Sequence, residues 1–285
     1  MPHPRPWLGF DMLVRLVDSH RVAVLSGAGV STESGIPDYR GPESRQRDHT
    51  PIQYDEFIGD ENVRRHYWAR STVGWPSFRA AEPNAGHRAL ARLEDAGSVR
   101  GIITQNVDGL HQQAGSANVI ELHGALSDVR CLECDTVTSR DHLQERLRAL
   151  NPGWMRHASA VAPDGDARIP RSETRGFCVP ECGSCGGVLK PKVVFFGENT
   201  RPGPVERAWS LLEQAEVLLV LGSSLHVYSG YRFVRGAADA DCPVAIVNVG
   251  PTRGDSVAEV RVDAQTGQLL PQLADVLGAR RASSR

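Results

Sequence analysis

Two pairs of cysteines in this chain have the spacing of metal ligands. Each pair has the form Cys-x-x-Cys, and the four residues are Cys131, Cys134, Cys182 and Cys185. Two such pairs can close a tetrahedral zinc site, and four thiolates leave no open position for a substrate. The sequence therefore predicts one structural Zn²⁺. Cys178 lies outside both pairs and is a competing ligand, whereas Cys242 precedes an apolar segment and is interpreted as a small buried hydrophobe.

A glycine-rich stretch follows the first apolar segment, residues 21–25 (RVAVL). This segment predicts a buried parallel strand, and residues 27–29 (GAG) come next. Glycines after a strand let the backbone approach a pyrophosphate, and the N-terminus of a following helix offers free N–H groups. Thr32 occupies the place of the third glycine of the dinucleotide fingerprint, so an ordinary tight turn is the alternative. Asp38 and Arg40 add polar groups just beyond this stretch.

Polar side chains follow a second predicted strand, residues 99–104. Gln105, Asn106 and Asp108 place two amides and a carboxylate at its carboxyl end, where open α/β sheets bind their ligands. The alternative is an Asx-type turn that caps the next helix. Farther along, His123 stands beside a glycine and is sterically accessible. Histidine is the usual general base near neutral pH, and a purely structural histidine is the alternative.

Small residues follow two more apolar segments. Residues 222–224 directly follow the apolar segment 217–221 (VLLVL), and residues 248–250 overlap the end of the segment 244–249 (VAIVNV). Small side chains at strand ends permit close approach to a ligand, although the packing of loops explains each of them singly.

Strands that alternate with helices must position these groups. Helices are expected at residues 87–95 and 204–214, and the alternation predicts an α/β fold with a Rossmann-type, doubly wound parallel sheet. Two stretches break the pattern and predict a smaller domain: a helical module at residues 45–84, helical around 61–70, and a zinc module at 130–189. The Rossmann-type domain then comprises residues 1–44, 85–129 and 190–278, and residues 279–285 form a frayed tail.

Composition excludes several classes of partner. The 285 residues carry a formal net charge of −2, which favours neither nucleic acid nor an anionic membrane. No apolar run reaches the roughly 18–20 residues that span a bilayer. Neither a secretion signal nor an organelle presequence is recognisable at the start, so a cytoplasmic protein is expected.

Taken in order, these motifs resemble those of the sirtuin family. The resemblance extends from about residue 20 to residue 270, nearly the whole chain. Its motifs are residues 27–31 and 35–40, residues 104–108, His123 with Gly124, the two cysteine pairs, and residues 195–198, 222–224 and 248–250. Residues 65–70, 189–191 and 227–232 are similar to the class II, sirtuin-four-like branch. Tyr39 stands where many sirtuins have Phe.

The resemblance implies an NAD-dependent protein-lysine deacylase that uses NAD as a co-substrate and acts on acyl-lysine proteins. The acyl oxygen would attack the nicotinamide ribose, and His123 would act as general base on a ribose hydroxyl. Asn106, the second catalytic residue, and Asp108 would position the ribose and the carboxamide. The products would be free lysine, nicotinamide and O-acyl-ADP-ribose. Val193, Val194 and Phe195 would pair with the substrate backbone as a strand. The implied NAD contacts are Gly27, Ala28, Gly29, Asp38, Tyr39, Arg40, Gln105, Asn106, Asp108, Gly222, Ser223, Ser224, Asn248, Val249 and Gly250.

Tyr67 and Arg70 add a hypothesis about the acyl group. They are spaced i, i+3 on a predicted helix and therefore share a face. The resemblance implies that such a Tyr-x-x-Arg pair looks toward the acyl tail, and arginine can hold a carboxylate through two parallel hydrogen bonds. The hypothesis is a preference for longer acyl chains, carboxylated ones included, over acetyl. The alternative is a surface helix in which Arg70 pairs with Glu61 or Asp60.

Three other functions compete with this interpretation. Transfer of ADP-ribose to a protein would use the same NAD site, so the sequence leaves it open. An NAD(H)-dependent oxidoreductase would need Gly at position 32 and an acidic residue about 20 positions beyond the fingerprint. A zinc-knuckle module that binds nucleic acid would need a basic stripe, which the acidic balance of the chain argues against.

Overall fold

Six parallel strands form the larger sheet. The computed structural model describes residues 7–39, 51–156 and 165–283. The sheet has the order β3-β2-β1-β7-β8-β9, which is the usual order of a doubly wound nucleotide-binding fold and confirms the predicted fold class. Its strands are β1 (Val22–Ser26), β2 (Val99–Thr104), β3 (Val119–Glu121), β7 (Val217–Leu221), β8 (Val244–Val247) and β9 (Val260–Val262).

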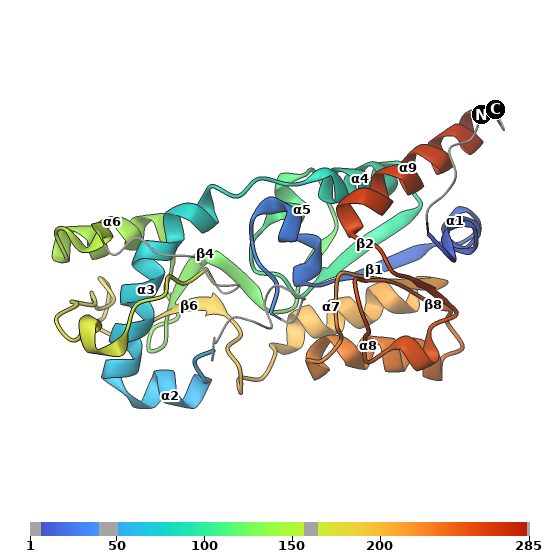
Figure 1. The fold of residues 1–285 in the computed structure, drawn as a ribbon. Helices are drawn as coiled ribbons and strands as arrows, with labels where there is room; N and C mark the ends of the chain where they lie inside the picture. The colour runs from blue at the N-terminus through green and yellow to red at the C-terminus, as the bar shows by residue number, and fades with distance from the viewer. Residues whose placement is uncertain (1–6, 40–50, 157–164, 284–285) are drawn as a thin grey trace.

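Helices cover both faces of this sheet (Figure 1). Because successive side chains of a strand point to opposite faces, Val22 and Val24 of β1 join one core, and Ala23 and Leu25 join the other. The first core is shared with α1 (Phe10–Ser19), α4 (Ala85–Asp95) and α9 (Thr266–Ser283), and the second with α7 (Pro202–Glu213) and α8 (Tyr228–Asp239). Burial on both faces is why the central strands β1, β7 and β8 are almost wholly apolar.

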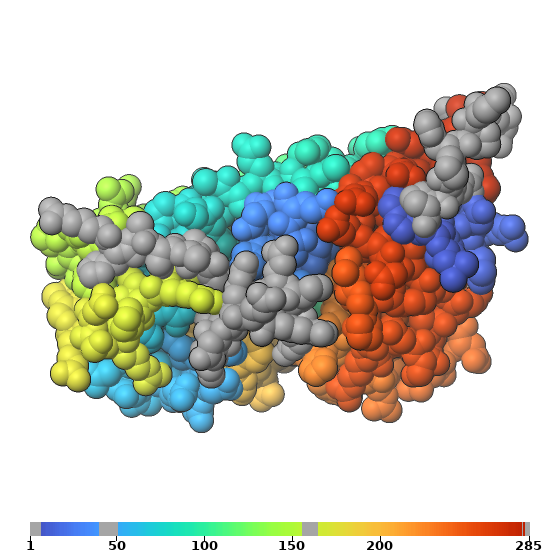
Figure 2. All heavy atoms as spheres, viewed as in Figure 1, coloured from blue at the N-terminus to red at the C-terminus, as the bar shows by residue number. Residues whose placement is uncertain are grey.

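A smaller antiparallel sheet of order β5-β4-β6 lies beside the larger one (Figure 1). Its strands are β4 (Gly124–Cys131), β5 (Val137–Ser139) and β6 (Leu189–Val193), and it is accompanied by α2 (Tyr54–Gly59), α3 (Glu61–Arg79) and α6 (Arg140–Leu150). The boundaries that the sequence predicts at 129/130 and 189/190 fall inside β4 and β6. Figure 2 shows the C-terminal residues at one end of the molecule and the residues of the predicted zinc module at the other.

Two local expectations are corrected. Two 3-10 turns, η1 (Ala28–Val30) and η2 (Thr32–Ser34), follow β1 in place of the expected helix, and Gly35 ends them at φ 83°. The tail predicted as frayed continues α9 to Ser283, since Leu277 anchors the helix in the core and alanine and arginine favour helix. The described residues also form the short helical turns α5 (Leu110–Gln113), η4 (Trp154–Arg156), η5 (Arg171–Thr174) and η6 (Asp255–Val257). Within the described ranges, no helix is both long and apolar enough to cross a membrane.

Candidate active site

A cavity of about 1,090 Å³ opens at the carboxyl ends of β1, β2, β7 and β8. With one exception, the residues predicted to contact NAD line it; the exception, Arg40, lies outside the described residues. The cavity is also lined by Tyr67 of α3 and by residues 193–195. Val193 is the last residue of β6, and residues 194 and 195 follow it. The structure therefore brings together groups that the sequence spreads over more than 200 positions.

The glycines after β1 are explained first by contact between two loops. The amide of Gly27 donates to the carbonyl of Leu221 at 2.9 Å, and the amide of Gly29 donates to that of Gly222 at 2.8 Å. A Cβ added at Gly27 would lie 2.8 Å from Cβ of Ser223. These two amides are therefore not the free pyrophosphate donors that the motif suggests. The glycines instead close the junction of β1 and β7, the point at which the sheet reverses its strand order.

Polar side chains after β2 form a connected group. Nδ2 of Asn106 donates to Oγ of Ser31 at 3.1 Å and to the carbonyl of Gly27 at 3.2 Å. Oγ of Ser31 donates to Oδ2 of Asp108 at 2.7 Å, and the amide of Leu110 donates to Oδ1 of Asp108 at 2.9 Å. Burial raises the pKa of Asp108. Asp108 thus makes the Asx-type turn that was the alternative interpretation, and it also lines the cavity.

A buried chain of hydrogen bonds supports Asn106 from below. The backbone N–H of Asn106 donates to Oγ1 of Thr104 at 3.1 Å, and Oγ of Ser26 donates to the same hydroxyl at 2.9 Å. Nε2 of His111 lies 2.9 Å from Oγ of Ser26. Burial, followed by the charge of His87, lowers the pKa of His111 to about 3, so this imidazole is neutral. The chain ties the ends of β1 and β2 together beneath the cavity.

His123 lies on the cavity wall with both ring nitrogens engaged. Nδ1 is 2.9 Å from the backbone carbonyl of Gln105, and Nε2 is 2.7 Å from Oγ of Ser229. Because a carbonyl only accepts, Nδ1 must carry the proton and donate. Nε2 of the neutral ring is then the acceptor, and the hydroxyl of Ser229 donates to it. The geometry leaves a basic nitrogen on the cavity side, as a general base requires.

Two serines in this arrangement were not among the predicted site residues. Ser31 lies inside the glycine-rich motif, so its position carried a signal that was not used. Ser229 lies in the segment 227–232, which was singled out only for its resemblance to one branch of the family. Its contact with His123 joins residues 106 positions apart, and no local pattern indicates such a pair.

The four predicted zinc ligands come together. Their sulfur atoms all lie within 4.8 Å of one another, with Sγ of Cys131 3.5 Å from that of Cys185 and Sγ of Cys134 3.8 Å from that of Cys182. A tetrahedron with Zn–S bonds of about 2.3 Å has S–S edges of roughly 3.8 Å, so the set fits zinc. Cys178 is outside this group. Cys131 ends β4 and Cys134 lies in the turn that follows, whereas Cys182 and Cys185 precede β6, and none of the four lines the cavity.

The structure separates Tyr67 from Arg70. Tyr67 lines the cavity, whereas Arg70 is buried behind the wall and is absent from the cavity lining. Arg70 donates from Nε to the carbonyl of Ala167 at 3.0 Å, and its Nη2 lies 3.6 Å from Oδ2 of Asp166. Asp166, which sequence reasoning did not consider, does line the cavity. The partner of Arg70 is therefore neither Glu61 nor Asp60, and Glu61 instead pairs with Arg65 at 2.6 Å.

Comparison with known proteins places this arrangement. Residues 27–229 match the Sir2 family. The chain is 53% identical over 270 residues to NAD-dependent protein deacetylase 1 of Mycobacterium avium (strain 104), covering 93% of this chain and 94% of the relative. It is 47% identical over 256 residues to the mitochondrial NAD-dependent protein lipoamidase sirtuin-4 of Bos taurus, covering 89% and 81%. A solved structure of Sir2 bound to acetylated peptide superposes with a TM-score of 0.76 at 27% identity, covering 95% of this chain and 99% of the other. The chain belongs to the Sir2 family, the sirtuins.

Proposed function

We propose that this protein is an NAD-dependent protein-lysine deacylase that converts acyl-lysine, NAD and water to lysine, nicotinamide and O-acyl-ADP-ribose. The observation that carries the proposal is the orientation of His123. Its basic Nε2 is directed by the Gln105 carbonyl into the cavity that the predicted NAD-binding residues line. The relatives named as NAD-dependent deacetylase and lipoamidase support the same reaction.

Each group at the site has a task in this reaction. NAD, when bound, supplies a ribose carbon whose bond to nicotinamide breaks as the acyl oxygen of the substrate attacks it. Asn106 and Asp108, held by Ser31, orient the ribose and the carboxamide. Nε2 of His123 then accepts the proton of a ribose hydroxyl, which takes the place of the Ser229 hydroxyl as hydrogen-bond donor. The fixed carbonyl of Gln105 stabilises the imidazolium that results.

The substrate backbone is proposed to pair beside residues 193–195. β6 is an edge strand of the smaller sheet: one side of β6 pairs with β4, and the other side has no partner strand among the described residues. The amide of Val194 already donates to the carbonyl of His123 at 2.8 Å, which aligns this segment with the base. A peptide added as a strand would therefore bring its acyl-lysine toward the cavity that His123 lines.

Product analysis tests the proposal. NAD would be incubated with the protein and a panel of acyl-lysine peptides, and all products would be identified by mass spectrometry. Equal amounts of free lysine peptide, nicotinamide and O-acyl-ADP-ribose are expected. Peptide or protein carrying ADP-ribose would show transferase activity instead, and reduced NAD would show redox chemistry. Either of those outcomes as the main activity would contradict the proposal.

Two features of the cavity bear on which acyl group the site accepts: its apolar wall and the charge of Asp166. Ile36, Phe78, Val107 and Leu126 give the cavity an apolar wall, which favours acyl chains longer than acetyl. Asp166 pairs with Arg70 at 3.6 Å and, although almost fully buried, is one of the residues that line the cavity. We therefore propose that the enzyme prefers long neutral acyl groups, which narrows the hypothesis drawn from the sequence. A lipoyl-like substrate is consistent with the relative named as a lipoamidase.

Replacing Asp166 should change this selectivity. In Asp166→Asn the cavity wall loses a negative charge and the charge of Arg70 behind it is no longer neutralised, so a substrate carboxylate is attracted rather than repelled. We expect the ratio of kcat/KM for succinyl-lysine to that for octanoyl-lysine to rise roughly tenfold, which corresponds to about 1.4 kcal/mol of electrostatic interaction. Asp141→Asn is the matched control. Asp141 of α6 pairs at 3.3 Å with Arg79, which lies on α3 as Arg70 does, but Asp141 does not line the cavity. An unchanged ratio in Asp166→Asn would contradict this account.

The pH dependence of kcat/KM should report the environment of His123. Burial lowers the pKa of His123, and the charge of Arg232 lowers it further, whereas the bond to the Gln105 carbonyl acts in the opposite direction. The base works only when neutral, so activity should be present above this pKa and fall as the pH drops through it. The acid limb is expected below about 6.5, the ordinary value for histidine. Arg232→Gln should move this limb to higher pH, and a limb that does not move would argue against the assignment.

A further inference from the structure

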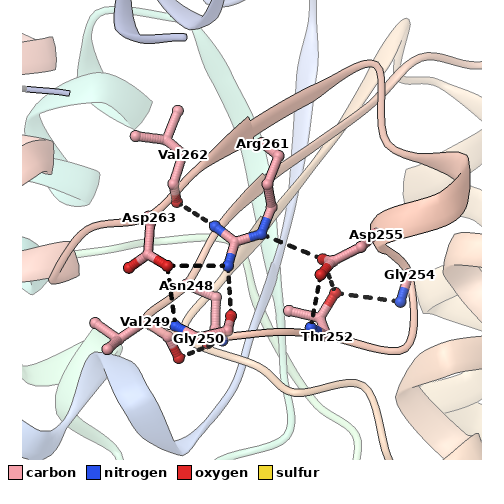
Figure 3. Close-up of polar contacts among 9 residues, drawn as sticks. All are labelled: Asn248, Val249, Gly250, Thr252, Gly254, Asp255, Arg261, Val262 and Asp263. Atoms are coloured by element: carbon pink, nitrogen blue, oxygen red, sulfur yellow. Dashed lines mark hydrogen bonds and ion pairs between the residues drawn. The ribbon is translucent and has the colours of Figure 1, made fainter. Parts of the chain in front are cut away.

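The loop that follows β8 is held by a network of polar contacts (Figure 3). Residues 248–253 line the cavity, but several partners that fix them stand behind it, on β9 and η6. Nδ2 of Asn248 donates to the carbonyls of Val249 and Gly250 at 2.9 and 3.0 Å. Gly250 has a φ of 75°, in the left-handed region, so the chain turns sharply at this point.

Arg261 is the centre of this network. One guanidinium serves four acceptors: Nη2 donates to the carbonyl of Gly250, Nη1 to that of Val262 at 2.6 Å, and Nε to Oδ1 of Asp255 at 3.2 Å, while Asp263 lies 3.7 Å from Nη2 (Figure 3). The carboxylate of Asp263 in turn accepts from the amide of Gly250 at 3.3 Å. The carbonyl and the amide of Gly250 are therefore both held from the β9 side.

Asp255, which pairs with Arg261, also fixes the far end of the loop. Oδ1 and Oδ2 of Asp255 accept from the hydroxyl and the amide of Thr252 at 2.6 and 3.0 Å. Partial burial acts to raise the pKa of Asp255, but the hydrogen bonds from Thr252 and the charge of Arg261 hold it below its usual value. The amide of Arg253 donates to the carbonyl of Ser224 at 3.0 Å, which joins this loop to the one after β7.

We infer that Arg261 is a positioning residue for the adenosine half of NAD, acting through residues 248–253. The inference rests on the proposed function. His123 and Asn106 place the reacting ribose on the β2 side of the junction between β1 and β7, so the other half of the dinucleotide extends toward β8 and β9. Arg261 is not part of the cavity lining, and it reaches the ligand only through the loop.

The test separates NAD binding from turnover. Loss of the charge-assisted bonds in Arg261→Ala frees Gly250 and leaves Asp255 and Asp263 without their shared cation. We expect KM and Kd for NAD to rise about tenfold, while KM for the peptide and kcat at saturating NAD stay near wild type. Arg261→Lys should recover only part of the affinity, because an ammonium cannot match the planar geometry of four acceptors.

Arg92→Ala is the matched control. Arg92 pairs with Asp275 at 2.8 Å between α4 and α9, and neither residue lines the cavity. The Arg92→Ala substitution should lower Tm slightly and leave the Kd for NAD unchanged. If Arg261→Ala lowers Tm but binds NAD as tightly as Arg92→Ala does, Arg261 is only structural and the inference is overturned. A wild type that binds no NAD would overturn the proposed function as well, and it is recognisable because every variant would then share the defect.

Discussion

His123→Ala should lower kcat for deacylation by roughly 10²–10⁴-fold, the usual contribution of a positioned general base. The side chain is held by the Gln105 carbonyl and by Ser229, and no other described residue repeats this geometry around the cavity. Its loss removes the group that takes the ribose proton, whereas the groups around Asn106 that orient NAD remain in place. Affinity for NAD should therefore stay near wild type.

The position of the defect in the reaction is also predicted. In the proposed scheme the base acts after the bond to nicotinamide has broken, so exchange of labelled nicotinamide into NAD should persist in His123→Ala. His142→Ala is the control, because His142 is an exposed histidine of α6 outside the cavity lining. Wild-type turnover in His123→Ala would show that another group is the base, and loss of NAD binding would show that His123 mainly holds the site together.

Cys131→Ser should remove zinc and destabilise the smaller sheet. Structural zinc supplies on the order of 10 kcal/mol of apparent binding free energy to a metal-dependent module. Cys131 is buried at the end of β4 and packs in the same hydrophobic cluster as Phe57, Trp68 and Leu189. We expect less than one zinc per chain, a Tm well below that of the wild type, and aggregation. Metal analysis and calorimetry measure these effects.

Cys178→Ser distinguishes the ligands from a bystander. Cys178 is exposed and outside the group of four, so this variant should keep one zinc and the wild-type Tm. A wild type purified without zinc would contradict the site, and loss of zinc from Cys178→Ser would mean that Cys178 replaces one of the four.

The larger sheet could be predicted because its central strands are buried on both faces. Residues 217–221 are apolar at every position, and β7 has the same bounds in the structure. The two edge strands escaped notice, since β3 and β9 have only three residues each and offer no pattern. The turns after β1 were mistaken for a helix because a glycine motif indicates a turn but does not specify the element that comes after the turn.

The chemistry of the site was more readable than its contacts. In a reducing compartment, four cysteines in two Cys-x-x-Cys pairs indicate zinc from their spacing alone, so this part of the prediction depended little on the fold. Arg70 shows the opposite case. The i, i+3 spacing indicates that Tyr67 and Arg70 share a helix face, but Asp166, nearly 100 residues later, decides what Arg70 contacts. Ser229 and Arg261 act through partners that only the folded chain supplies.

The order of strands in the larger sheet has a consequence for how the chain folds. β1 lies between β2 and β7, and the contact between Arg21 and Glu216 beside it spans 195 residues. On a ribosome that adds about 5–20 residues per second, β1 waits roughly 10–40 s before β7 is made. β2 and the four zinc-binding cysteines are made during that interval, whereas the edge of β1 that pairs with β7 has no partner strand until the interval ends. Pairing over such a separation closes slowly, so refolding of this enzyme should be limited by the return of its C-terminal half to β1.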